Sequence, residues 1–67
     1  MDNSLKVWRA EEDLTQAELA QQVDVSRQTI NAIETGKYDP SLELAFKLAN
    51  RFDCAIEDLF SYEPPAD

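Results

Sequence analysis

The stretch from Thr15 to Gly36 constrains the fold more than any other part of this 67-residue sequence. Thr15 and Glu18 have the spacing of a capping box, in which the hydroxyl accepts a backbone N–H and the carboxylate reaches back to the helix start. Asp24 interrupts the pattern, Ser26 can cap a second helix, and Gly36 can end it in a left-handed conformation. The stretch therefore predicts two short consecutive helices joined by a tight turn.

Apolar side chains at helical spacing predict which faces of these two helices pack together. Leu19, Ala20 and Val23 form a stripe on the first helix, and Ile30 and Ile33 form one on the second. Ala20 is small where the two helices should cross, so the backbones can approach closely.

Further helices are expected on both sides of this pair. Asn3 or Ser4 can cap a helix that ends near residue 12 or 13, with Leu5 and Trp8 one turn apart on its inner face. Trp8 is expected in the core, with its indole N–H near the edge.

The C-terminal half predicts two more helices after a loop over residues 37–40. Ser41 is the expected cap of the fourth helix, and Asp39 followed by Pro40 at the first helical position is the alternative. The apolar residues at helical spacing in this helix are Leu42, Ala45, Leu48, Ala49 and Phe52. A short fifth helix is expected over residues 55–60, and the prolines that follow forbid further helix. The predicted fold class is all-α, with five short helices.

Length and composition exclude several classes of protein. Sixty-seven residues leave no room for a second domain, so one domain over residues 1–67 is expected. The single Cys54 and the absence of histidine argue against a disulfide, a metal site or an activated nucleophile. Cys54 is expected to be a small buried hydrophobic residue. No catalytic residue, cofactor or small-molecule ligand is predicted, and an enzyme is a distant third possibility.

The sequence also lacks the features of a membrane or exported protein. No apolar run approaches the roughly 18 residues that a membrane span needs, and the N-terminal residues lack the apolar segment of a signal peptide. A single cysteine suits a reducing compartment, so a cytoplasmic location is expected.

Three segments, "LTQAELA", "VSRQTINAIETGKYDPSLELAFKLA" and "IEDLF", resemble the Cro-like helix-turn-helix regulators. The resemblance runs from about Leu5 to Phe60, with the helix-turn-helix over about residues 16–35. It implies a five-helix fold, a homodimer and binding of a DNA operator that usually represses transcription. It also implies that the second helix crosses the DNA backbone and that the third, the recognition helix, lies in the major groove.

The resemblance assigns base contacts to Arg27, Gln28 and Asn31, on the exposed side of the recognition helix. Their chemistry suits that role, since Arg can donate two hydrogen bonds to guanine and Gln can pair with adenine through two. The alternative is that these side chains form an ordinary solvated helix face.

The resemblance also assigns contacts with the DNA backbone, to Gln16, Thr29, Lys37 and Tyr38. For Tyr38 the alternative is simple packing on the loop. Arg9 and Glu34 match a pair that joins the first helix to the recognition helix. We expect this pair to be partly buried and to neutralise the one acid between residues 26 and 38.

Two positions depart from the family pattern in ways that affect local stability. Asp24 stands where glycine is usual, and the backbone there is expected to have φ > 0, which Asp tolerates less well than Gly. Ala55 stands where Ser or Thr would cap the fifth helix, and losing that cap costs about 1 kcal/mol.

The region over residues 52–62 is expected to form the homodimer contact, because its apolar side chains exceed what one small core needs. These side chains are Phe52, Ile56, Leu59, Phe60 and Tyr62. A two-fold dimer would place the recognition helices about 34 Å apart, to match successive major grooves.

The charge balance raises a question for a DNA-binding protein, since 14 acids against 6 bases give a net charge of −8. A cytoplasm of about 1 M salt would shorten the Debye length to about 3 Å and remove long-range repulsion from DNA. A host with a salt-rich cytoplasm is therefore one hypothesis. The alternative is an interaction module, such as an antitoxin-like protein, whose acidic surface docks a basic partner.

Overall fold

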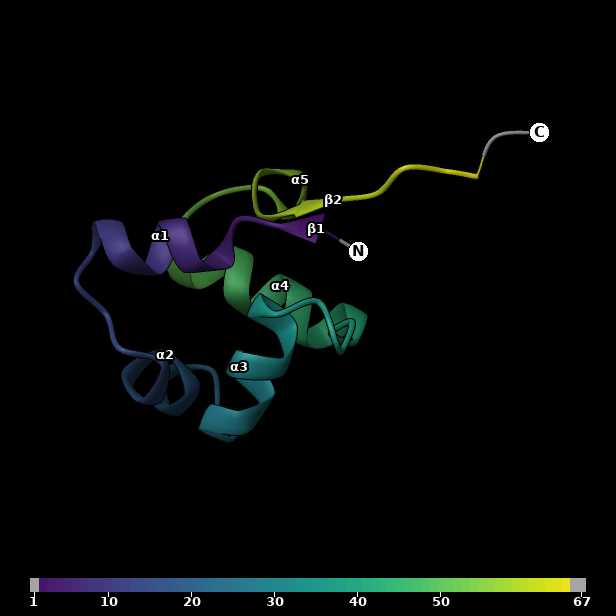
Figure 1. The fold of residues 1–67 in the computed structure, drawn as a ribbon. Helices are drawn as coiled ribbons and strands as arrows, with labels where there is room; N and C mark the ends of the chain where they lie inside the picture. Colours follow the sequence, from purple (N-terminus) through teal and green to yellow (C-terminus); the bar gives the residue numbers. More distant parts are fainter. Residues whose placement is uncertain (1, 66–67) are drawn as a thin grey trace.

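The computed structural model describes residues 2–65 and contains five helices and a two-stranded sheet (Figure 1). The helices are α1 (Leu5–Glu11), α2 (Gln16–Gln22), α3 (Arg27–Glu34), α4 (Leu42–Phe52) and α5 (Ile56–Leu59). Strand β1 (Asp2–Asn3) pairs antiparallel with strand β2 (Phe60–Ser61). The predicted all-α fold class with five helices is confirmed, and the structure adds two short strands that were not predicted.

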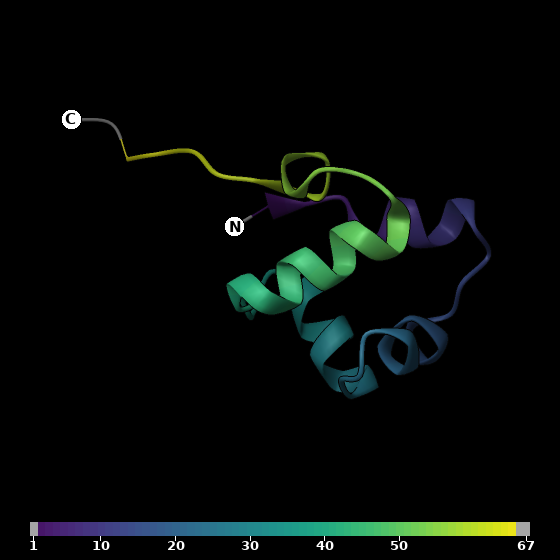
Figure 2. The ribbon, with the colours of Figure 1, turned by 180° about the vertical axis from the view of Figure 1, so that it is seen from behind.

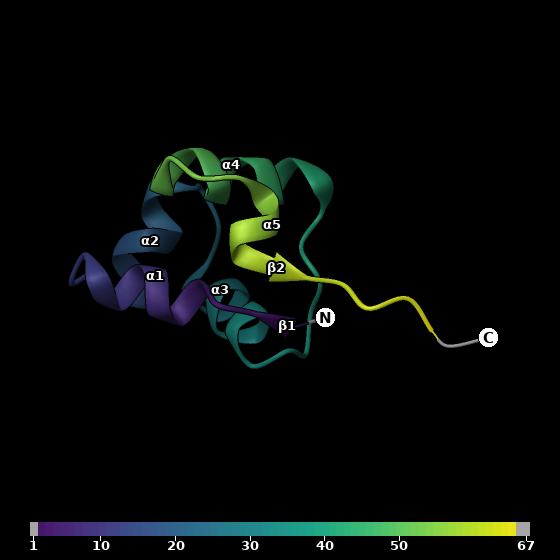
Figure 3. The ribbon, with the colours of Figure 1, turned by 90° about the horizontal axis from the view of Figure 1, so that it is seen from above.

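The helices surround a single core. Seen from behind, α4 runs across the molecule between the α2–α3 pair and the sheet with α5 (Figure 2). From above, α4 lies along one side and α1, α3 and β1 along the other, and the chain after β2 extends away from the body (Figure 3). The buried apolar residues of this core are Leu5, Leu19, Ala20, Val23, Ile30, Ile33, Leu44, Ala45, Leu48, Ala49, Phe52, Leu59 and Phe60.

Side-chain caps define where α2, α3 and α4 begin, as the sequence predicts. In the capping box of α2, the Glu18 N–H donates to Thr15 Oγ1 (3.0 Å) and the Thr15 N–H donates to Glu18 Oε1 (2.9 Å). Ser26 and Ser41 each accept one backbone N–H at 3.2 Å, so Ser41 is the cap of α4. These bonds satisfy amides that have no partner within the helix.

The caps of α1 and α5 differ from this pattern. Ser4 occupies the N-cap of α1 without a side-chain cap, and the Leu5 N–H donates instead to Asn3 Oδ1 at 3.2 Å. In α5 the expected weakness at Ala55 is partly offset, because its backbone N–H donates to Asp58 Oδ2 at 2.9 Å.

Each of the first four helices ends at or just before a residue in the left-handed conformation. These residues are Asp13 (φ 54°), Asp24 (φ 64°), Gly36 (φ 75°) and Asp53 (φ 55°). The predicted positive φ at Asp24 is confirmed, and the same conformation at Asp13 and Asp53 was not foreseen. A Cβ at Gly36 would meet nothing within 4 Å, so backbone conformation rather than space favours glycine there.

The prediction that the fifth helix includes Phe60 is wrong. Helix α5 stops at Leu59, and Phe60 is extended and pairs with Asn3 in the sheet. The Ser4 N–H also donates to the Leu59 carbonyl at 2.8 Å. Pairing with β1 therefore satisfies backbone groups that a further helical turn would otherwise have used.

Trp8 joins α1 to the C-terminal half of the chain. Its half-buried ring lies 6.1 Å from the Phe52 ring, between centroids, and its indole N–H donates to the Asp58 carbonyl at 3.3 Å. The expected position of the N–H at the edge is thus confirmed, whereas the ring packs against the core and is not one of its fully buried side chains.

Within residues 2–65, no helix has the length and apolar character needed to span a membrane. The half-buried Cys54 packs against the core. Burial raises the pKa of its thiol, and the nearby carboxylates of Asp58 and Asp53 raise it further. The thiol is therefore a poor nucleophile at neutral pH.

Candidate nucleic-acid interface

The outward face of α3 presents the three side chains predicted to contact bases. Ile30 and Ile33 are 0% and 1% exposed and fix the opposite face of the helix against the core. Arg27, Gln28 and Asn31 are consequently exposed. Together with Gln16 from the start of α2, they line one groove on the surface.

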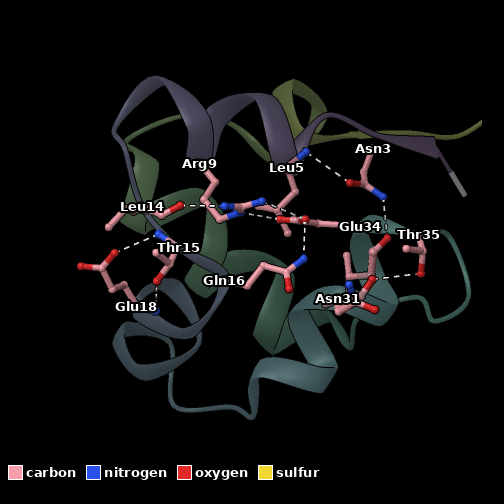
Figure 4. Close-up of polar contacts among 11 residues, drawn as sticks. Asn3, Leu5, Arg9, Leu14, Thr15, Gln16, Glu18, Asn31, Glu34 and Thr35 are labelled. Carbon is pink, nitrogen blue, oxygen red and sulfur yellow. Dashed lines mark hydrogen bonds and ion pairs between the residues drawn. The ribbon is translucent and has the colours of Figure 1, made fainter.

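The predicted Arg9–Glu34 pair is present and partly buried, with side-chain exposures of 16% and 4%. Arg9 Nε donates to Glu34 Oε2 at 2.8 Å, and Arg9 Nη2 donates to Glu34 Oε1 at 3.3 Å (Figure 4). Arg9 Nη1 also donates to the Leu14 carbonyl at 2.7 Å. The pair joins α1 to the last turn of α3 and neutralises the one acid on that helix.

Gln16 belongs to the same network. Its Nε2 donates to Glu34 Oε1 at 2.9 Å, so Glu34 receives hydrogen bonds from both Arg9 and Gln16 (Figure 4). No buried side-chain nitrogen or oxygen within residues 2–65 lacks a hydrogen-bond partner. A phosphate contact by Gln16 remains a prediction, since its amide N–H is engaged with Glu34 in this structure.

The remaining predicted backbone contacts lie outside this groove. Thr29 is half-buried, and its hydroxyl lies 3.0 Å from that of Ser26, beside the cap of α3. Lys37 and Tyr38 are exposed in the loop after α3, where their backbone N–H groups donate to the Ala32 carbonyl at 2.9 and 3.2 Å. The loop is thus folded back onto the C-terminal end of α3, whereas the groove includes the first turn of α3.

Arg27 and Lys37, the two basic residues of this region, differ from most other cations of the chain in forming no ion pair within residues 2–65. Arg9, Lys47 and Arg51 each form an ion pair with a carboxylate. Among the ion pairs within residues 2–65, none involves Arg27 or Lys37. Both cations are therefore available to an external anion.

Asn3 is a polar contact of α3 that the sequence did not reveal. Its Nδ2 donates to the Ile33 carbonyl at 2.8 Å, in the last turn of the helix (Figure 4). The sequence suggests Asn3 only as a cap of the first helix, because a hydrogen bond between residues 30 positions apart leaves no local pattern.

The dimer contact was predicted from a surplus of apolar side chains over residues 52–62, and three of these side chains are not surplus in the structure. Phe52, Leu59 and Phe60 are 6%, 0% and 8% exposed, so they fill the core of their own chain and are not surplus to it. The reason is that α5 is a single turn that closes the core. Ile56 is half-buried, and Tyr62 is 72% exposed.

A different apolar surface lies across the beginning of α4 and α5. Pro40, Leu42, Ala45, Ile56 and Phe60 line a groove there. Leu42 was expected on the apolar stripe of its helix but is 70% exposed, and Phe46, one turn further, is 52% exposed. We call Pro40, Leu42, Ala45, Phe46, Ile56 and Phe60 the α4–α5 face.

Comparisons with known proteins agree with this architecture. The model of a family described as helix-turn-helix matches residues 5–59. An HTH-type transcriptional regulator of Methanocaldococcus jannaschii is 62% identical over 63 residues, which cover 94% of this chain and 96% of that protein.

Two solved structures are also similar. The restriction-modification controller protein C.AhdI of Aeromonas hydrophila superimposes with a TM-score of 0.76 at 30% identity, covering 84% of this chain and 85% of that chain. The clp gene regulator ClgR of Corynebacterium glutamicum has a TM-score of 0.74 at 28% identity over 81% of this chain. The present chain spans 57% of the length of that ClgR chain.

Proposed function

The chain belongs to the helix-turn-helix family, of the Cro-like type, and from this premise we propose that it is a transcriptional repressor binding a two-fold DNA operator as a homodimer. In this proposal residues 1–67 act as one domain in the cytoplasm. Helix α3 enters the major groove and α2 crosses the DNA backbone.

The observation that carries this proposal is the grouping of Arg27, Gln28 and Asn31 with Gln16 around one exposed groove. Arg27 can donate to the O6 and N7 of guanine, and Gln28 can form two hydrogen bonds with adenine. Asn31 lies one turn further along the same helix and can form the same kind of adenine contact. The three side chains thus suit readout of different bases from one helix.

Contacts with phosphates would hold α3 in register. Lys37 has no ion-pair partner within residues 2–65 and lies with Tyr38 at the opposite end of α3 from Arg27. Thr29 and Gln16, near the starts of α3 and α2, are proposed to bind phosphate at the other end. For Gln16, a phosphate oxygen would compete with Glu34 for the amide N–H.

We assign the dimer contact to the α4–α5 face. Leu42 and Phe46 are large apolar side chains that are 70% and 52% exposed, one helical turn apart. In a two-fold dimer this face would meet its own copy and cover them. A domain of this size buries only about 60% of its unfolded surface, so the additional burial would stabilise the fold as well as the pair.

Selection of bound fragments from random DNA, at low and at molar salt, tests the proposed function. The recovered sequences should share two symmetric half-sites, centred about 10 base pairs apart. A variant with Arg27→Ala, Gln28→Ala and Asn31→Ala should enrich no sequence. Glu11→Gln, on the exposed side of α1, is the control and should recover the same operator. Failure of the unaltered chain to enrich any sequence would contradict the proposal.

Sedimentation tests the dimer separately from DNA binding. The double substitution Leu42→Ser and Phe46→Ser should convert a dimer into a folded monomer. Val7→Ser is the matched control, since Val7 is 57% exposed on α1, away from this face. A wild-type chain that remains monomeric at high micromolar concentration, with and without DNA, would refute the dimer.

The net charge of −8 supports a second candidate function, which is docking of a basic protein by the acidic surface. This candidate is antitoxin-like and needs no base-contacting residues. It would gain support if no DNA sequence were enriched at any salt concentration.

A further inference from the structure

Asn3 connects strand β1 to the recognition helix through its amide nitrogen and to the start of α1 through its amide oxygen. Its Nδ2 donates to the Ile33 carbonyl at 2.8 Å, and its Oδ1 accepts the Leu5 N–H at 3.2 Å (Figure 4). The Ile33 carbonyl also accepts the Gly36 N–H at 3.0 Å. Asn3 therefore contacts α3 at its last turn, just before the left-handed residue that ends the helix.

The same strand is attached on its other side to the region that follows α5. Asn3 is paired with Phe60 and Asp2 with Ser61 in the two-stranded sheet. Ser4 adds two bonds, from its N–H to the Leu59 carbonyl at 2.8 Å and from its hydroxyl to the Asp58 carbonyl at 3.0 Å. Phe60 lines the α4–α5 face together with Ile56. One residue thus joins the recognition helix to the side of the molecule that bears the proposed dimer contact.

We infer that Asn3 is a positioning residue that sets the orientation of α3 relative to the α4–α5 face, and through it the operator spacing that the dimer accepts. This inference rests on the proposed function, since spacing has meaning only for a dimer on two half-sites. A tilt of α3 that pivots at its last turn is largest at its first turn, where Arg27 and Gln28 lie. Arg9 braces the same turn from α1, but α1 carries no part of the α4–α5 face.

Two substitutions of Asn3 separate its two hydrogen bonds. Asn3→Asp keeps an acceptor for the Leu5 N–H but loses the donor to the Ile33 carbonyl, and Asn3→Ala loses both. Ser4→Ala is the matched control, because it removes only the hydroxyl bond to the Asp58 carbonyl and leaves the contact of Asn3 with α3 intact. The backbone bonds of β1 with β2 and of Ser4 with Leu59 still hold the N-terminal segment against α5 in this variant.

The measurement is the affinity of each variant for the selected operator, for operators with one base pair added or removed between half-sites, and for an isolated half-site. We expect Asn3→Asp to bind the selected operator with about three- to tenfold lower affinity, which is the factor that the loss of one hydrogen bond represents. The loss on altered spacings should be smaller, so that the preference for one spacing becomes flatter. Half-site affinity should be unchanged, and Ser4→Ala should keep the wild-type preference.

Circular dichroism establishes that each variant is folded, and sedimentation that it is still dimeric. If Asn3→Ala does not fold, Asn3→Asp alone decides the question. Folded dimers of Asn3→Asp that retain the full spacing preference would overturn the inference while leaving the proposed function intact. A wild-type chain that binds a single half-site as well as the whole operator would contradict the proposed dimeric function, and this inference with it.

Discussion

At the scale of single residues, specificity and affinity are expected to come from different side chains. Gln28→Ala should cost about 1–3 kcal/mol on the selected operator and little on random DNA, because it removes contacts with one base. Lys37→Ala should weaken binding to both alike and reduce the salt slope by about one, because it removes a phosphate contact. Binding titrations on both DNAs at several salt concentrations make the comparison. Equal losses on every sequence would remove Gln28 from the base-contacting set.

The Arg9–Glu34 pair should be strongly coupled. Arg9→Ala leaves a carboxylate that is 4% exposed without its cation, which should cost about 2–5 kcal/mol in the free energy of unfolding. The double variant with Glu34→Ala should be more stable than Arg9→Ala alone. Urea unfolding of the four proteins in the cycle gives the coupling energy.

The Arg51–Glu12 pair provides a matched control for that cycle. Its side chains are 28% and 42% exposed, so its coupling should be only about 0–1 kcal/mol. Equal coupling in the two cycles would show that burial does not strengthen the Arg9–Glu34 pair.

The sequence predicts the charged pair but not its amide partners. Arg9 and Glu34 could be proposed from resemblance, because opposite charges at fixed positions are recognisable in a sequence. Gln16 and Asn3 also contact this end of α3. An amide can donate or accept almost anywhere, so only the folded backbone decides which distant carbonyl or carboxylate it meets.

At the scale of helices, the left-handed aspartates place carboxylates near helix C-termini, where the helix dipole disfavours them. Asp24→Asn keeps a side chain that tolerates φ > 0 and removes the charge, so it should stabilise the fold by about 0.3–1 kcal/mol at low salt. Glu57→Gln is the control, because Glu57 lies in the first turn of α5, where a negative charge is favourable. Both changes reduce the net charge equally. If they alter the unfolding free energy by the same amount, the dipole explanation fails.

The capping box of α2 should contribute to acid sensitivity. Hydrogen bonds from the Thr15 backbone and hydroxyl lower the pKa of Glu18 below its ordinary value of 4.5. Since the folded-state pKa is depressed, the stabilisation is present above pH 4.5 and is lost as the pH falls through the lower folded-state value. Glu18→Gln should therefore melt below the wild type at pH 6, and the difference should shrink toward pH 3. A difference in melting temperature that is constant with pH would contradict this contribution.

Helix starts were predictable from the sequence, whereas the sheet was not. Thr15, Ser26 and Ser41 act within three residues of their partners, so their roles are local. Strands of two residues show no alternation of polar and apolar side chains, and β1 pairs with β2 from the far end of the chain. Because this pairing leaves no local signal, the helical pattern of apolar residues predicted a helix through Phe60. In the structure Phe60 belongs to β2 and not to α5.

At the scale of the whole molecule, the chain is strongly acidic, whereas α3 itself carries one acid, Glu34, which is paired with Arg9. A dimer would carry twice −8, or −16, and would therefore repel both itself and DNA. Added salt screens both kinds of repulsion. Each phosphate contact weakens with salt, with a slope of about −0.9 per contact. Within residues 2–65, Arg27 and Lys37 are the cations near α3 that form no ion pair with a carboxylate. With so few cations to contact phosphates, the loss of affinity with salt should be small.

Operator affinity should therefore depend only shallowly on salt, with an optimum above the lowest concentration, and melting temperature should rise over the same range. Titrations and melting curves from about 0.05 to 2 M KCl, over which the Debye length contracts several-fold, measure both. A steep, continuous loss of affinity with no gain in melting temperature would reject the proposal of a salt-rich host. That outcome would favour an acidic surface that binds a basic protein.

The position of Trp8 gives the molecule a built-in optical reporter. It is the single tryptophan, it packs against Phe52 of α4, and its N–H is bonded to the carbonyl of Asp58 in α5. Its fluorescence thus responds to the junction of α1, α4 and α5 and not to the groove at the start of α3. Emission intensity can follow unfolding of the unlabelled protein while DNA is present, and a quencher in solution can report whether that junction opens when the operator binds.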